Sequence, residues 1–190
     1  MKLLSGKGFT LVEILVAISV FIIVTMIVSA VFVNTSNLQR HLSSIQRLQN
    51  EGRFILEKIS KEARVRELDY QQLTVLNPNN PQAITDSLVF KRDENDAILK
   101  IKKSGDNLIF FIEDPQGAVT AGVINASDVT IEDVKFFVSP STDPFTLGSA
   151  ANEQPRVTIL LKIKNRNVAE RYLKHLTIET TISSKVYKQK

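Results

Sequence analysis

The chain has 190 residues, enough for one modest globular domain beside a membrane segment. Its 24 basic and 20 acidic residues leave a formal net charge of +4, too small an excess to indicate nucleic acid or an acidic substrate on its own. There is no cysteine, which excludes a disulfide, a thiol nucleophile and a cysteine-based zinc site.

The first predicted element is a membrane-length helix. Residues Ile14–Val33 carry no charge, and a helix of that length spans about 30 Å, the thickness of a bilayer's hydrocarbon core. A secretory signal peptide cleaved near Ala30 is a competing interpretation. The apolar run, however, exceeds the usual ~7–15 residues and has an acid, Glu13, near its start. A plain single-pass anchor explains the length but gives no reason for Glu13.

The residues directly before this run form a motif. Gly8–Glu13 reads GFTLVE and follows a short leader with two lysines. This segment resembles the processing site of type IV pilins and pseudopilins. The resemblance implies that a prepilin peptidase cuts after Gly8 and methylates the new amino terminus on Phe9. It also implies that Glu13 pairs with the terminal amine of a neighbouring subunit during assembly. A simpler reading of Glu13 is an interfacial acid that reaches water.

The resemblance also implies what the protein does. A second, looser match supports it: Gln49–Arg64 resembles the helix of W-type minor pilins and J-type pseudopilins. We therefore expect a minor pilin or pseudopilin, a structural subunit that assembles into or initiates a type IV pilus or a type II secretion pseudopilus. The implied partners are prepilin peptidase, other pilins, an inner-membrane assembly platform and membrane lipid. The implied location is the inner membrane, with the C-terminal domain outside the cytoplasm, in a surface filament or a periplasmic pseudopilus.

After Val33 the sequence becomes polar but stays helical in its period. Apolar residues recur at spacings of mostly three and four, as on one face of a helix. We expect one helix from Phe9 to about Leu68, apolar all round in its first half and amphipathic in its second. Gly52 lies on the apolar stripe, where glycine costs about 1 kcal/mol relative to alanine. Either a sheet approaches closely there, or Gly52 is a tolerated weak point.

The rest of the chain predicts strands. Asn77–Pro81 is a turn-rich break, Ser104–Asp106 predicts a hairpin turn, and Ser139–Pro155 predicts a long loop. The predicted strands are Ser87–Lys91, Ala97–Lys103, Asn107–Glu113, Val129–Val138, Arg156–Lys164 and Leu176–Ser183.

A sheet needs a cover for its apolar face, and the amphipathic half-helix supplies one. The expected fold is therefore α+β and pilin-like: a long N-terminal helix packed on one antiparallel sheet of about five or six strands. The expected segments are a leader (1–8), a transmembrane or filament-core helix (9–33), its amphipathic continuation (34–68) and a β-rich globular domain (69–190).

No pattern predicts catalysis, a metal or a cofactor. His41 and His175 are the two histidines, and neither has a nearby partner pattern for a triad or a metal site. The acidic cluster Asp93–Asp96 has oxygen ligands that suit calcium, although a solvated turn is the simpler interpretation. The C-terminal lysines (Lys185, Lys188 and Lys190) suggest an alternative function, a DNA-binding minor pilin of a competence pilus, against the default of a frayed terminus.

Overall fold

The computed structural model describes residues 8–73, 83–91, 97–145, 153–166 and 174–184. The predicted turn at Asn77–Pro81, the acidic cluster Asp93–Asp96 and the C-terminal lysines lie outside these ranges. The chain divides into two compact units, Met1–Ser43 and Ser44–Lys190.

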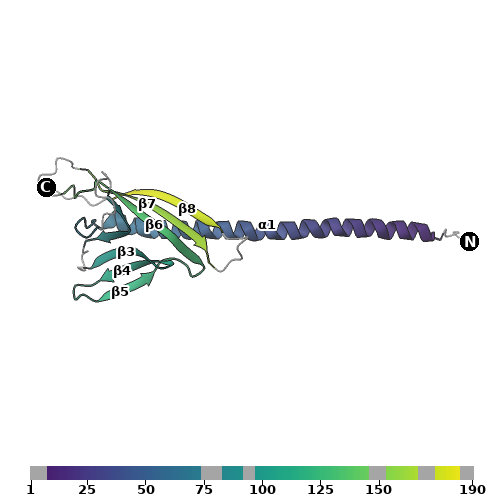
Figure 1. Ribbon diagram of the computed structural model, residues 1–190, viewed down its shortest axis with the longest axis horizontal. Coiled ribbons are helices and arrows are strands. Elements are labelled where there is room, and N and C mark those ends of the chain that lie inside the picture. The colour runs from purple at the N-terminus through teal and green to yellow at the C-terminus, as the bar shows by residue number, and fades with distance from the viewer. Residues whose placement is uncertain (1–7, 74–82, 92–96, 146–152, 167–173, 185–190) are drawn as a thin grey trace, which may run out of the picture. The chain divides into compact units, whose positions relative to one another are not determined.

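The described part contains one helix, α1, from Leu11 to Val65 (Figure 1). It begins two residues later and ends about three residues earlier than the sequence predicts. Thr10 is the residue before the helix, and its Oγ1 accepts the N–H of Glu13 at 3.3 Å. At the other end Leu68 forms an antiparallel bridge with Phe90, so the chain has left the helix to pair with a strand.

Two four-stranded antiparallel sheets follow, not the single sheet predicted from the sequence. Their strand orders are β1-β6-β7-β8 and β2-β3-β4-β5. The first sheet contains β1 (Ala83–Thr85), β6 (Val129–Ser139), β7 (Arg156–Asn165) and β8 (His175–Ser183). The second contains β2 (Ser87–Phe90), β3 (Ile98–Ser104), β4 (Asn107–Glu113) and β5 (Val119–Val123).

The sheets separate because the chain changes sheet within one residue. Thr85 pairs with Phe136 of β6, whereas Ser87 pairs with Lys102 of β3, and only Asp86 lies between them. Strands β1 and β5 were not predicted. The predicted hairpin turn is confirmed: Ser104 pairs with Asn107, and Gly105 has a φ of 57°, which glycine adopts without strain.

The α+β class is confirmed, because one helix packs against both sheets. A single hydrophobic core contains residues of the helix and of both sheets. The buried residues of α1 are Leu48, Gly52, Ile55, Leu56, Ile59 and Ala63.

Gly52 marks a close approach of helix and sheet. A Cβ at Gly52 would overlap the Cδ1 of Ile178 on β8 and lie 3.3 Å from the Cδ1 of Ile163 on β7. Of the two interpretations of Gly52, close approach of a sheet is therefore the correct one.

A buried asparagine joins the two sheets. The Oδ1 of Asn125 accepts the backbone N–H of Leu108 on β4 at 2.9 Å, and its Nδ2 donates to the carbonyl of Val129 on β6 at 2.7 Å. The Asn125 side chain therefore hydrogen-bonds to the backbone of both sheets at the point where the chain passes from one sheet to the other. Nearby, the Oε1 of Glu51 accepts the backbone N–H of Ala126 at 2.6 Å and ties this crossing to α1.

Candidate processing and assembly site

The peptide bond between Gly8 and Phe9 lies just outside the helix. Residues 8–10 have no regular secondary structure, and all three are exposed, with the Phe9 side chain 78% exposed. A Cβ placed on Gly8 would meet nothing within 4 Å. This chain therefore does not itself need glycine at position 8, and any requirement for it belongs to an enzyme that reads the segment.

Thr10 and Glu13 mark the start of α1. Thr10 Oγ1 accepts the Glu13 N–H, and the Thr10 carbonyl accepts the N–H of Ile14 at 3.3 Å. A threonine followed three residues later by a glutamate is the capping-box pattern. This role of Thr10 was not predicted, although the T-x-x-E spacing before an apolar run is a sequence signal for it.

Glu13 lies in the first turn of α1, and its side chain is exposed. A carboxylate there interacts favourably with the positive end of the helix dipole, typically by about 0.3–1 kcal/mol at a water-exposed surface. This local effect is independent of any neighbouring subunit.

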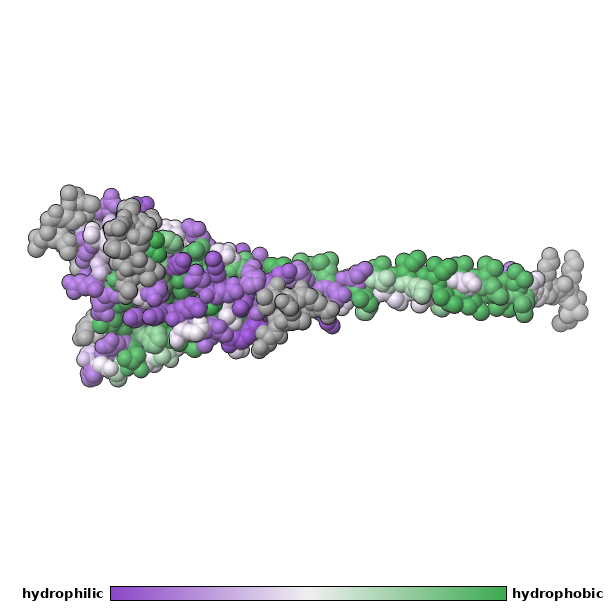
Figure 2. All heavy atoms as spheres, viewed as in Figure 1, coloured by the Kyte–Doolittle hydropathy of each residue, from purple (hydrophilic) through white to green (hydrophobic). Residues whose placement is uncertain are grey.

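The helix after Glu13 presents an apolar surface on every side. Its large apolar side chains from Phe9 to Val33 are all at least half exposed, and Figure 2 shows the visible face of this segment as mostly hydrophobic, with a few paler patches. It is long and apolar enough to cross a membrane, judged by length and composition. A surface of this kind requires lipid or other apolar helices around it.

The three hydroxyl groups in this segment are already hydrogen-bonded within the helix. Ser19, Thr25 and Ser29 each donate to the carbonyl four residues earlier, at 2.8 Å. A polar group without a partner would cost free energy in hydrocarbon, and these internal bonds remove that cost. The segment therefore suits an apolar environment despite its polar residues.

The two histidines belong to different units of the chain. His41 is half-buried on α1, whereas the Nδ1 of His175 on β8 lies 2.8 Å from the Oε2 of Glu132 on β6. Lys164 Nζ lies 3.4 Å from the other carboxylate oxygen of Glu132. The hydrogen bond with His175 holds the pKa of Glu132 below its ordinary value, against a smaller opposing effect of burial, and Lys164 adds to the lowering. No group of three or more metal-ligating side chains occurs in the described ranges.

A second charged cluster, which the sequence did not predict, lies beyond the end of α1. Lys91 Nζ lies 2.5 Å from Glu67 Oε1 and 3.7 Å from Asp143 Oδ2. Burial alone would lower the pKa of Lys91, but the hydrogen bond and charge of Glu67, with Asp143, outweigh it and raise the pKa. Burial, followed by the charge of Asp143, raises the pKa of the neighbouring Tyr70. These contacts fasten the chain after the helix to β2.

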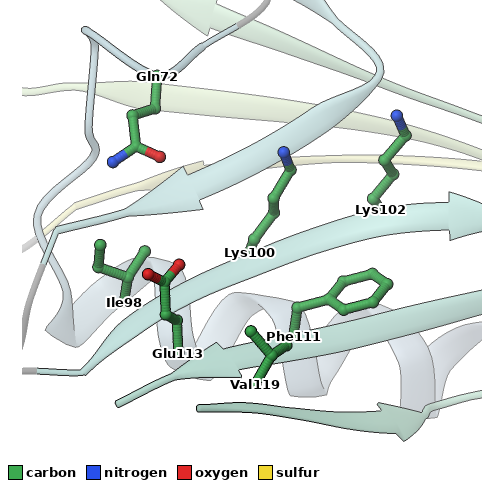
Figure 3. A pocket seen from close by; sticks show the side chains of 7 residues that line it. All are labelled: Gln72, Ile98, Lys100, Lys102, Phe111, Glu113 and Val119. Carbon is green, nitrogen blue, oxygen red and sulfur yellow. The ribbon is translucent and has the colours of Figure 1, made fainter. Parts of the chain in front are cut away.

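A shallow hollow of about 320 Å³ lies on the outer face of the second sheet (Figure 3). Its lining combines apolar side chains with charged ones: Gln72, Ile98, Lys100, Lys102, Phe111, Glu113 and Val119. These residues include neither a histidine nor a hydroxyl nucleophile.

Comparison with known proteins identifies the N-terminal segment. Residues 5–29 match the family model of the prokaryotic N-terminal methylation motif, the signature of type IV pilins and pseudopilins. No curated protein and no solved structure matches the chain. The chain is thus pilin-like at its N-terminus, which indicates a structural subunit that a prepilin peptidase processes and that assembles with other pilins. The apolar helix and the motif together fit single-pass anchoring in the inner membrane.

Proposed function

We propose that this protein is a minor pilin or pseudopilin that joins, or initiates, the filament of a type IV pilus or a type II secretion pseudopilus. One observation carries the proposal: the methylation motif at residues 5–29 covers the start of an exposed apolar helix whose hydroxyl groups are hydrogen-bonded within the helix. Such a helix can exchange lipid contacts for contacts with other apolar helices, which is the physical basis of filament assembly.

Four segments with different roles follow from this proposal. Residues 1–8 are a leader that is removed, 9–33 the membrane and filament-core helix, 34–68 its amphipathic continuation and 69–190 the β-rich domain. The β-rich domain lies outside the cytoplasm and forms the filament's outer surface. The assembly platform in the inner membrane then acts on the apolar segment and its lipid surroundings.

Glu13 supplies the register of assembly. An ionised carboxylate costs on the order of 2.5–3.5 kcal/mol at the centre of a bilayer and less near its edge. Cleavage after Gly8 creates a positive amine on Phe9, which four residues of helix would displace by about 6 Å along the axis. A neighbouring subunit shifted along the filament brings its own amine level with Glu13, and each charge then neutralises the other.

The test of the processing step is the intact mass of the protein extracted from membranes of cells that contain the peptidase. We expect a chain that begins at Phe9 and carries one added methyl group. Gly8→Ala leaves the chain's own packing unchanged, because a Cβ there meets nothing, and we expect it to accumulate as the uncleaved precursor. A mature chain that begins at Val31, or a wild-type chain that retains its leader, would contradict the proposal.

The alternative, a DNA-binding minor pilin of a competence pilus, has one structural observation in its favour. From Arg53 onward the exposed face of α1 carries four cations, Arg53, Lys58, Lys61 and Arg64, against one fully exposed acid, Glu57. Binding to DNA through phosphates would weaken steeply as salt increases. Equal retention of the wild type and a Lys61→Ala/Arg64→Ala variant on DNA at low salt would exclude this face as a DNA site.

A further inference from the structure

The two sheets have four outer strands, and for two of them, β5 and β8, no described segment pairs with the outer edge. The segment after α1 covers β2, since Asp69 N–H donates to Val89 O at 2.9 Å and Lys91 N–H to Glu67 O at 2.8 Å. Strand β1 has only three residues. Within the described ranges no strand pairs with the outer edges of β5 and β8, which have five and nine residues.

The hydrogen-bonding groups on the open edge of β5 can be assigned. The bonds Ile124 N–H to Leu108 O (2.9 Å) and Asp114 N–H to Ala118 O (3.0 Å) show that even-numbered residues of this segment bond to β4. Bonding direction alternates along an antiparallel strand, so Val119, Ala121 and Val123 direct their N–H and C=O groups to the open edge. All five residues of β5 are exposed. None is a lysine or a proline, which natural edge strands use to prevent pairing.

The open edge of β8 has the same arrangement. The bonds Asn165 N–H to Lys174 O (3.4 Å) and Ser184 N–H to Pro155 O (2.9 Å) assign the even-numbered residues to β7. The backbone groups of Thr177, Glu179 and Thr181 therefore point to the open edge, and their side chains are exposed. Each edge thus offers donors and acceptors at every second residue, the spacing that another strand requires.

The two edges are also oriented to fit each other. Strand β5 runs toward the start of the second unit's helix, since Ala126 shortly after it binds Glu51. Strand β8 runs away from that end, because its first residue pairs with Lys164, next to Asn165, which bonds Ser44. Figure 1 shows β5 and β8 on opposite flanks of this unit. Two copies side by side, with this part of α1 pointing the same way, therefore bring β5 and β8 together antiparallel.

We propose that β5 of one copy pairs antiparallel with β8 of a second copy, with Ala121 opposite Glu179 of that copy. This register places Val119 opposite Thr181 and Val123 opposite Thr177, and all four residues are β-branched, which suits a strand. Strand β5 has no charge to oppose Glu179. The outer face of its sheet carries two cations on β3, Lys100 and Lys102, against one acid on β4, Glu113.

The pairing is head-to-tail and can repeat from copy to copy. It is also small: stable interfaces use about 20–30 residues a side, and β5 supplies five. Copies that share one membrane or filament have a high effective concentration, which a weak contact needs. The proposal therefore rests on the membrane anchoring proposed above, but it requires neither cleavage at Gly8 nor a role for Glu13.

The test uses the absence of native cysteine. Two full-length copies with different tags are co-expressed, one with Ala121→Cys and the other with Glu179→Cys, and the membranes are oxidised. Residues opposite each other in a hydrogen-bonded antiparallel pair have Cα atoms about 5.5 Å apart, within disulfide range. We expect a disulfide-linked dimer that contains both tags. The matched control is Thr120→Cys with Glu179→Cys, because Thr120 points to the other face of the sheet, and we expect several-fold less dimer.

A second test probes whether Ala121 lies opposite Glu179 by changing the charge at position 121 and placing the cysteines at a neighbouring pair. In a Val119→Cys and Thr181→Cys background, Ala121→Glu places two carboxylates opposite each other, whereas Ala121→Lys places opposite charges there. We expect Ala121→Glu to lower the cross-linked fraction about threefold or more relative to Ala121→Lys. The proposal is overturned if Ala121→Cys alone gives dimers as readily, if cross-linking joins a different protein, or if the two charge variants behave alike. Unchanged thermal unfolding of each variant establishes that the fold is intact.

Discussion

The two halves of α1 have the same backbone and opposite surroundings. In the first unit, Ile23 is 57% exposed and every neighbouring side chain is also exposed. In the second unit, Ile55 and Ile59 are fully buried against the sheets, while the opposite face carries charges. The two halves therefore suit two different environments, and the difference lies in how the apolar residues of the helix are distributed. An apolar surface all round suits lipid or other helices, and an apolar stripe suits a sheet.

The polar groups of the two halves differ in the same way. In the first half the hydroxyls bond to the helix's own carbonyls. In the second half Ser44 bonds to Asn165, Arg47 lies 2.5 Å from Asp128, and Glu51 bonds to Ala126. The hydroxyl groups in the first half thus need no hydrogen-bond partner outside the helix, whereas polar side chains in the second half attach the helix to the β-rich unit.

An isoleucine-to-alanine substitution should have very different effects on stability in the two halves of α1, and this is the largest difference that we expect. Ile59→Ala removes a fully buried side chain and should lower the free energy of unfolding of the β-rich unit by about 2–5 kcal/mol. Ile23→Ala should change it by less than about 0.5 kcal/mol. Chemical denaturation of the full chain in mild detergent measures both. Equal effects would mean that the two halves are not in different environments.

Gly52 tests how closely the second half packs on the sheets. Gly52→Leu places a side chain where the end of Ile178 lies and should cost about 1–3 kcal/mol by overpacking. Gly52→Ala should change stability by less than about 1 kcal/mol, because the flexible end of Ile178 can turn away and alanine favours the helix by a similar amount. Asn50→Leu on the exposed face is the control for leucine itself. A Gly52→Leu variant as stable as this control would refute the close approach.

The smallest expected effect is the pH dependence that Glu132 gives to the β-rich unit. The folded-state pKa of Glu132 is lower than its unfolded value. Its contribution is therefore present above the unfolded pKa and is lost as pH falls through the folded one. Glu132→Gln should make stability less sensitive to pH below about 4.5, the ordinary value of the group. Denaturation between neutral and acid pH measures this, and an unchanged acid slope would exclude the role.

Sequence predicted the features that depend on local spacing. The motif around Gly8, the change of hydrophobic period along α1 and the Gly105 turn each lie within a short window, and the structure contains the helix and that turn. Thr10 could have been recognised by the same means. Whether the Gly8–Phe9 bond is cut, and what Glu13 binds, depends on other proteins and stays a prediction.

Features that depend on distant partners were missed. Strand β5 reads VTAGV, which is short, contains a glycine and has no buried face, so its pairing with β4 defines it. Strand β1 has three residues and is likewise defined by β6. The contact between Glu132 and His175 joins residues 43 positions apart. The division into two sheets at Asp86 has no counterpart in hydrophobic period, because β1 and β2 are separated by a single residue.

The incorporation of a Glu13→Leu variant into filaments is the most direct test of the central claim. We expect the variant to be cleaved after Gly8 and inserted in the membrane, yet to be absent from sheared filaments, because its neighbour's amine has no carboxylate to meet. Glu57→Leu makes the same change on the exposed face of the second half and should be incorporated normally. Fractionation with an antibody against the β-rich unit quantifies both. Normal incorporation of Glu13→Leu would contradict the claim that Glu13 pairs with a neighbouring subunit.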